Sequence, residues 1–268
     1  MSVPSQGSPS APLDTSVAHP ARRYDYWLGG RDNFPADRES GDAIAAAFPG
    51  IRIAVLENRR FLRRAVAFLA RQGIRQFLDI GSGIPTSPNV HEVAQAVDTT
   101  ARVVYVDNDP VVLAHARALL TGSPAGATAY LDADLREPEK IVEEARGRLD
   151  PRQPVGLLLI ATAHFIPDED DPYGIVSRLV TTLAPGSYLV MSHATSDYLP
   201  PELVADIASG RHGAGKLRTR EEFARFFDGL ELVPPGIVPV AEWRADEEPQ
   251  PRPTPEETAV YAAAARIP

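Results

Sequence analysis

Short runs of apolar residues alternate with longer amphipathic segments from residue 74 to the end of the chain. Each run has the length of a β-strand, and the segments between them place apolar residues at helical spacing. Such alternation predicts an α/β fold, with a mostly parallel sheet and helices on both of its faces. The predicted strands are 76–80, 102–107, 127–133, 155–162, 187–193, 231–240 and 259–267, and the predicted helices between them are 90–97, 110–120, 138–149, 172–183 and 219–230.

The first 73 residues show helical signals and no strand. Residues 43–48 predict a short helix, and residues 55–73 predict a long one that stops near Gly73. Residues 1–18 are rich in serine and proline, which predicts disorder. We therefore expect a disordered tail (1–18), a helical N-terminal cap (19–73) and an α/β domain (74–268).

Composition and charge exclude several classes of function. The net charge of −9 and the pI near 5.2 argue against a nucleic-acid partner. The chain has no cysteine, which excludes disulfides, thiolate zinc sites and cysteine nucleophiles. No apolar stretch reaches the ~18 residues of a membrane span, and the N-terminus lacks the features of a signal peptide. We expect a cytoplasmic protein with no membrane partner.

Two segments resemble metal motifs without completing them. The sequence HEVAQ (91–95) begins like HExxH, but Gln95 stands where the second histidine is required. The acidic run DEDD (168–171) lies just before a predicted helix and reads as a solvated turn. We expect no metal.

The first strand of the α/β domain ends in the turn DIGSG, which carries Asp79, Gly81 and Gly83. Ligands of doubly wound sheets bind at such turns, beyond the carboxyl ends of the strands. The dinucleotide fingerprint GxGxxG requires a third glycine where Thr86 stands, which argues against an NAD-dependent oxidoreductase. The acid at position 79 is awkward beside a pyrophosphate and suits a ligand that carries an ammonium group.

Acidic residues also follow the second and third predicted strands. The distance along the chain from Gly83 to Asp107 is close to the ~20 residues expected for an acid that binds ribose hydroxyls. The alternative is that Asp107 is a turn residue. Asp109 precedes Pro110 and a predicted helix, so it is better interpreted as the N-cap. Asp134 could accept a hydrogen bond from the exocyclic amine of a base, with Leu135 beside the ring; the alternative is an ordinary loop acid.

These motifs, in this order, resemble a known family. They are similar to the class I S-adenosylmethionine-dependent methyltransferases, and within them to a bacterial S-adenosyl methyltransferase family once known only as a domain of unknown function. The resemblance implies a Rossmann-like seven-stranded sheet, with the last strand antiparallel, and a helical N-terminal cap. It is carried by RRYDYWLGGRDNFPADRESG, ENRRFLRRAV, QFLDIGSGIPTSPNVHEVAQ, VVYVDNDPVVLAHARALL, DADLREPE and SYLVMSHATSD.

The resemblance implies S-adenosylmethionine as the cofactor and a role for each residue at the strand ends. The residues from Ala161 to His164 would pass beneath the methionine part. Gly81 and Gly83 would let the amino-acid part lie against the turn, with Asp79 near its ammonium, Asp107 on the ribose, Asn108 beside the adenine and Asp134 on the adenine amine.

The predicted cap supplies further candidates. Tyr24 is expected to contact the cofactor, because an aromatic face can hold a sulfonium; packing of the cap onto the sheet is the alternative. Asn33 could pin a sharp turn at Gly29-Gly30. Arg59 could meet the cofactor carboxylate, and the alternative is a surface arginine.

The sequence thus predicts a methyltransferase that acts on an unidentified small molecule. Methyl transfer from sulfur needs no acid, because the leaving group departs neutral, and a base is needed only for a protonated nucleophile. His164 and His193 follow the fourth and fifth strands and are candidate bases, or else hydrogen-bonded or substrate-lining histidines. A catalytically silent protein that binds S-adenosylmethionine, with a sensing or partner role, is the alternative function.

Overall fold

The fold is built on one mixed β-sheet, as the sequence predicts. A computed structural model describes residues 14–119, 125–211, 213 and 215–268. The strand order is β3-β2-β1-β4-β5-β8-β6, and β7 also pairs with β8. Strands β1 to β5 are parallel, and β8 runs antiparallel to β5. The main strands are β1 (Gln76–Ile80), β2 (Arg102–Asp107), β3 (Ala127–Asp132), β4 (Val155–Ile160), β5 (Tyr188–Ala194) and β8 (Val260–Arg266).

Helices cover both faces of the sheet, which explains why its central strands are apolar throughout. Every residue of β1 and β4 is buried. Alternate side chains enter opposite cores: Phe77 packs with one set of helices and Leu78 with the other. One face carries α3 (Ile51–Arg71) and α4 (Val90–Val97); the other carries α6 (Pro138–Arg146), α7 (Pro172–Val180) and α9 (Arg220–Ala224).

The order of the strands determines where a ligand can bind. The chain lays down β1, β2 and β3 outward in one direction and then crosses back to place β4 and β5 on the other side of β1. The order therefore reverses between β1 and β4, and crevices form at such switch points beyond the carboxyl ends of the strands. Helix α5 (Pro110–Leu119), which follows β2, begins at this end of the sheet.

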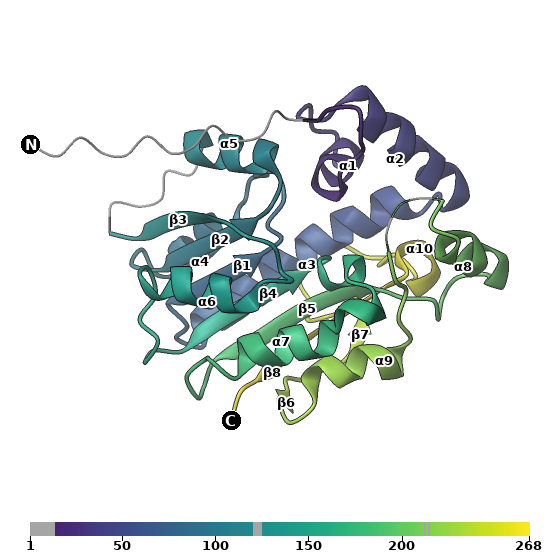
Figure 1. The fold of residues 1–268 in the computed structure, drawn as a ribbon. Helices are drawn as coiled ribbons and strands as arrows, with labels where there is room; N and C mark the ends of the chain where they lie inside the picture. Colours follow the sequence, from purple (N-terminus) through teal and green to yellow (C-terminus); the bar gives the residue numbers. More distant parts are fainter. Residues whose placement is uncertain (1–13, 120–124, 212, 214) are drawn as a thin grey trace, which may run out of the picture.

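Three helices lie near the carboxyl ends of the strands: α1 (Pro20–Trp27), α2 (Pro35–Ala47) and α8 (Pro201–Ala208) (Figure 1). The predicted helix at 43–48 is only the end of α2, which begins at Pro35, where Asp37 accepts the Phe34 N–H at 2.8 Å. The first half of α2 is polar and shows no apolar periodicity, so the sequence did not predict it. The sequence also failed to predict α8.

The C-terminal region differs most from prediction. The single strand predicted at 231–240 is two short strands, β6 (Glu231–Leu232) and β7 (Val238–Pro239). Pro234 and Pro235 cannot donate ladder hydrogen bonds, and Gly236 has a φ of +85°, so the chain turns between them. As a result, the part of the chain that the structure describes forms eight strands rather than the seven predicted.

The structure bears on only part of the predicted division into tail, cap and domain. Residues 1–13 of the predicted disordered tail lie outside the described residues, and regular structure begins at Pro20. Helix α3, placed in the cap by its sequence position, buries Phe61, Leu69 and their neighbours against the sheet. Short helical turns complete the fold: η1 (Ala163–Phe165), η2 (Asp168–Asp170), η3 (Arg225–Phe227) and α10 (Pro255–Thr258).

Candidate active site

A cavity of about 570 Å³ lies between the carboxyl ends of the strands and the cap helices. It is in the range of small-molecule sites, about 300–1,000 Å³. The cavity is lined by every candidate catalytic or cofactor-binding residue from the sequence except Asn33: Tyr24, Arg59, Asp79, Gly81, Gly83, Asp107, Asn108, Asp134, Leu135, Ala161, His164 and His193. Residues from both ends of the sequence therefore meet at the predicted switch point.

The two glycines of the first turn are needed for different reasons. Both have left-handed backbones, with φ of +72° at Gly81 and +67° at Gly83, which favours glycine. A Cβ on Gly81 would stand 2.5 Å from the side chain of Thr162, so there the bare backbone makes room for the protein itself. A Cβ on Gly83 would meet nothing within 4 Å. Gly81 thus has a reason for its bare backbone within the protein itself, and it also lines the cavity. That it makes room for a ligand as well stays a prediction.

Asp107 is held at the end of β2 by the turn that follows β1. Its Oδ2 accepts the Gly83 N–H at 2.8 Å, and its Oδ1 accepts the Asp109 N–H at 3.0 Å. Each carboxylate oxygen can accept a further hydrogen bond. Burial raises the pKa of Asp107, and the two backbone N–H groups act against that increase. The fixed carboxyl is thus able to accept two vicinal hydroxyls.

Asp79 is a buried acid, with 4% of its surface exposed. Burial raises its pKa to about 7, the positive charge of Arg59 opposes that change, and the negative charge of Asp107 adds to it. Arg59 is itself held by the loop after the glycine turn, where it donates to the carbonyls of Thr86 and Pro88. A carboxyl in this state gains much from a cationic ligand.

The ends of β2 and β3 are tied together by polar side chains. The Asn108 side chain donates to Asp134 Oδ2 at 2.8 Å, and the Arg136 N–H donates to Oδ1 at 2.8 Å. Leu135, buried to 6% exposure, lies next to them. This edge of the cavity combines one apolar wall with an acid that remains partly exposed.

A buried chain of hydrogen bonds connects the sheet to the cap. The Ala161 N–H donates to Ser192 Oγ at 2.9 Å, and that hydroxyl donates to Asn58 Oδ1 at 2.6 Å. Asn58 Nδ2 donates to Tyr24 Oη at 3.0 Å, and that hydroxyl donates to the Val55 carbonyl at 3.0 Å. The proton of the Tyr24 hydroxyl is thus committed to a backbone carbonyl, although Tyr24 also lines the cavity. Sequence reasoning missed Ser192, because a serine within a strand carries no motif.

Ala161, at the end of β4, has a φ of +55°. Few residues other than glycine adopt this conformation, and where they do it often marks a functional site. Here Ser192 holds the strained backbone on the cavity wall.

The two histidines differ in what their rings bond. His193 Nδ1 lies 2.7 Å from the Ala194 carbonyl, so it carries the proton, and its Nε2 accepts from Arg218 at 2.9 Å. Burial lowers the pKa of His193 well below its usual value, and His164 and Arg218 contribute. Burial, Arg218 and Arg23 lower the pKa of His164 to about 4. His164 Nδ1 is buried without a hydrogen-bond partner among the residues described.

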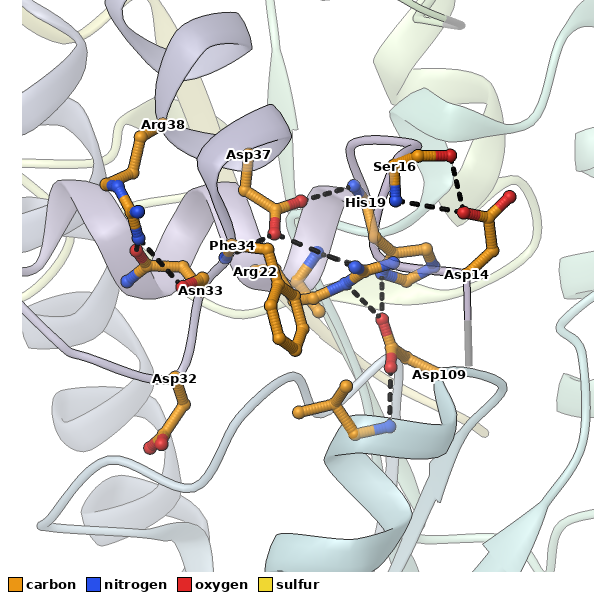
Figure 2. A network of polar contacts seen from close by, with 12 residues as sticks. Asp14, Ser16, His19, Arg22, Asp32, Asn33, Phe34, Asp37, Arg38 and Asp109 are labelled. Carbon is orange, nitrogen blue, oxygen red and sulfur yellow. Dashed lines mark hydrogen bonds and ion pairs between the residues drawn. The ribbon is translucent and has the colours of Figure 1, made fainter. Parts of the chain in front are cut away.

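Polar contacts join the N-terminal end of α1 to the turn after β2 (Figure 2). We call this cluster of His19, Arg22, Asp37 and Asp109 the latch. Asp109 Oδ2 lies 2.7 Å from His19 Nδ1 and 3.1 Å from Arg22 Nε, while its Oδ1 accepts the Val111 N–H at 2.7 Å. Asp37 completes the cluster: it accepts the His19 N–H at 2.8 Å and forms an ion pair of 3.7 Å with Arg22. The hydrogen bond to Val111 confirms the N-cap role predicted for Asp109, but the contacts of Asp109 with His19 and Arg22 were not predicted.

Asn33 holds the cap's internal turn. Its side chain donates to Asp25 Oδ2 at 2.8 Å and to the Gly30 carbonyl at 3.1 Å. It pins this turn, as the sequence suggested, but it does not line the cavity.

The donor set of the cavity suits a nucleoside with a charged amino-acid part. Three acids lie at or just beyond the carboxyl ends of three adjacent strands, and an arginine lies beside the most deeply buried of them. No group of three or more histidine and acidic side chains that could hold a metal ion occurs among the described residues. None of the described helices is long and apolar enough to cross a membrane.

This sheet order, with an antiparallel strand at one side and acids after the first three strands, defines a Rossmann-like methyltransferase fold. The chain belongs to the S-adenosyl methyltransferase family, whose model matches residues 6–268. Members of this family depend on S-adenosylmethionine, so the predicted family, class and cofactor are confirmed.

Two solved structures are similar over almost the whole chain. A DUF574 family protein from Streptomyces avermitilis is 48% identical, with 95% of this chain and 99% of that chain covered and a TM-score of 0.87. A protein from Thermobifida fusca is 42% identical, with 98% and 99% covered and a TM-score of 0.87. No curated protein matches the chain.

Proposed function

We propose that this protein transfers the methyl group of S-adenosylmethionine to a small molecule held in the same cavity. One observation carries the proposal: the cavity runs from the acids after β1, β2 and β3 to an apolar chamber under the cap. Cofactor and acceptor can therefore meet without solvent between them. A net charge of −9 and a cavity of this size favour a small molecule over a nucleic acid as acceptor.

The cofactor would be held mainly by the turn after β1 and the acid after β2. Asp79 would pair with its ammonium and Arg59 with its carboxylate, while Asp107 would accept both ribose hydroxyls. Gly83 leaves the backbone open on the cavity side. The remaining contacts would be the Tyr24 ring near the sulfonium, Asn108 and Leu135 beside the adenine, Asp134 on its amine, and Ala161 beneath the methionine part.

Catalysis by this arrangement would rest on alignment and exclusion of water. Of the two candidate bases, His164 is the better supported, because both ring nitrogens of His193 are already engaged. We propose that His193 and Arg218 position the wall behind His164. Arg218 is fully buried and also donates to the Ile166 carbonyl at 3.1 Å and to Asp168 at 2.6 Å.

The test uses S-adenosylmethionine with an isotopically labelled methyl group and a panel of acceptors, with products read by mass spectrometry. We expect label in at least one product. Asp107→Ala tests the cofactor site: it should weaken S-adenosylmethionine binding at least tenfold, about 1.4 kcal/mol, in a protein that remains folded. Tight binding without turnover on any acceptor would favour a silent cofactor-binding protein, and an unchanged titration in Asp107→Ala would remove Asp107 from the site.

A further inference from the structure

The cavity has two halves of different chemical character. The nucleoside half is formed by the turns after β1, β2 and β3. The acceptor half lies under the cap, beyond β4 and β5. Its walls are mainly apolar side chains from α1, α2, α3 and α8 and from the residue after α2: Trp27, Ile44, Phe48, Ile51, Leu203 and Ile207. Such walls favour a ligand with an apolar body.

The charged side chains that line the two halves of the cavity also differ. The acids that line the cavity, Asp79, Asp107 and Asp134, all belong to the nucleoside half. The acceptor half has Arg23 and Lys216 but no acid among its described lining residues. Lys216 forms a 3.1 Å ion pair with Asp168. The charged side chains that line this half among the described residues are therefore cations, with their acidic partners behind the wall, and this arrangement disfavours a cationic acceptor.

Arg23 is the charged group that the acceptor would meet. It is buried to 6% exposure, and its NH1 donates to the Ser40 hydroxyl at 3.0 Å. Burial lowers the pKa of Arg23, with the charge of Asp37 opposing. A buried cation on an apolar wall stabilises a negative charge that develops on a ligand nearby.

His164 adds the second polar feature of this wall. It faces Phe165 and His193 at ring-centroid distances of 4.3 and 5.6 Å, and the charges of Arg218 and Arg23 act on it. Its low pKa keeps the imidazole neutral near pH 7. Because Arg218 and Arg23 oppose a positive charge on this imidazole, a hydroxyl that is itself acidic, such as a phenol or an enol, suits the site better than an aliphatic alcohol.

We propose that the acceptor is a largely apolar molecule with one acidic hydroxyl, a phenol or an enol, whose oxygen lies between His164 and Arg23 and becomes methylated. This inference rests on the proposed methyl transfer. The hydroxyl proton passes to His164, and the oxygen forms its bond to the methyl carbon as the carbon–sulfur bond breaks. That electron pair stays on sulfur, which leaves as a neutral thioether, and His164 returns its proton to solvent.

The test measures binding by calorimetry at saturating S-adenosylhomocysteine, with three probes of one shape. These are 2-naphthol, naphthalene and 2-(aminomethyl)naphthalene, which is cationic at pH 7. We expect 2-naphthol to bind at least tenfold more tightly than naphthalene and the cationic probe to bind most weakly. We also expect bound 2-naphthol to ionise at a lower pH than free 2-naphthol, as read from its absorption spectrum.

Variants locate the effect on Arg23. Arg23→Gln should weaken 2-naphthol binding at least tenfold and leave naphthalene binding unchanged, while Arg23→Lys should restore part of the loss. Arg71→Gln, at an exposed position at the far end of α3, is the matched control and should change neither. Retained S-adenosylhomocysteine binding shows that each variant is folded.

The outcomes separate this inference from the function on which it rests. Equal binding of all three probes, or a 2-naphthol affinity unaffected by Arg23→Gln, would overturn the acceptor class while cofactor binding stands. Failure of the wild-type protein to bind S-adenosylhomocysteine would instead overturn the proposed function, and this inference with it.

Discussion

Asp79 shows how one side chain can link ligand binding to pH. It is buried between Arg59 and Asp107, and its pKa near 7 lies far above the usual value for an aspartate. Near neutral pH the free protein therefore holds this carboxyl about half protonated. A bound ammonium group favours the ionised form, so binding must release the proton.

Affinity for S-adenosylhomocysteine should accordingly rise as pH increases from 5.5 to 7.5, by about tenfold or more. The sign follows from the raised pKa: below 7 the ligand must displace a proton, and above 7 it need not. Titration calorimetry across this range measures the change. 5′-Methylthioadenosine, which lacks the amino-acid part, is the matched ligand and should bind with little pH dependence.

Asp79→Asn should remove most of the difference between the two ligands. Equal pH dependence for S-adenosylhomocysteine and 5′-methylthioadenosine would mean that Asp79 does not meet the ammonium.

For single residues, the sequence predicted where site residues lie better than it predicted their hydrogen-bond partners. Asp79, Asp107 and Asp134 lie at or just beyond the carboxyl ends of three neighbouring parallel strands, and these ends share one edge of the sheet, so the convergence of the three acids could be expected. The partners of Tyr24 could not, since Asn58 and Ser192 come from other elements and carry no motif. Likewise, nothing local in the sequence indicates that Arg218 caps His193.

Among the elements, those with strong apolar periodicity were predicted well and those defined by tertiary contacts were not. β4 and α3 are recognisable because burial gives each a regular apolar pattern. The region 231–240 forms two short strands only because each pairs with β8. The latch between α1 and the β2–α5 turn joins residues 87 positions apart, and no local pattern encodes it.

The latch should contribute strongly to stability. Asp109 and Arg22 are buried to 1% and 5% exposure. Removing Arg22 takes the positive charge away from two buried carboxylates, Asp109 and Asp37, although Asp109 keeps its contacts with His19 and Val111; loss of one partner of a buried ion pair costs about 3–5 kcal/mol. Arg22→Met should therefore lower the free energy of unfolding in urea by roughly that amount. Arg31→Met, at an exposed position in the same cap, should change it by less than about 0.5 kcal/mol.

The double variant Arg22→Met/Asp109→Asn tests whether the two residues act as a pair. Its loss of stability should be smaller than the sum of the single losses, because each single change already removes their interaction. Additive losses would show that the pair contributes little, whatever its geometry.

In the whole molecule, the cavity wall is shared by the cap helices and by the carboxyl end of the sheet. The cap contributes Trp27 to the cavity, whereas Trp243 lies fully buried beside Phe61, at a ring-centroid distance of 5.4 Å, in the core between α3 and the sheet. A ligand that contacts both the strand ends and the cap stabilises the state in which both are folded. Cofactor binding should thus join cap and sheet into one cooperative unit.

The two tryptophans of the chain allow this to be measured, because Trp243→Phe leaves only the cap reporter and Trp27→Phe only the core reporter. S-adenosylhomocysteine at 100 times its Kd should stabilise the folded state by about 2.7 kcal/mol. We expect both reporters to show the same increase in unfolding midpoint, each relative to its own ligand-free variant, since coincident transitions indicate two-state unfolding. An unfolding midpoint that shifts for the Trp243 reporter but not for the Trp27 reporter would mean that the cap does not take part in ligand binding. The cavity would then not be formed jointly by the cap and the sheet.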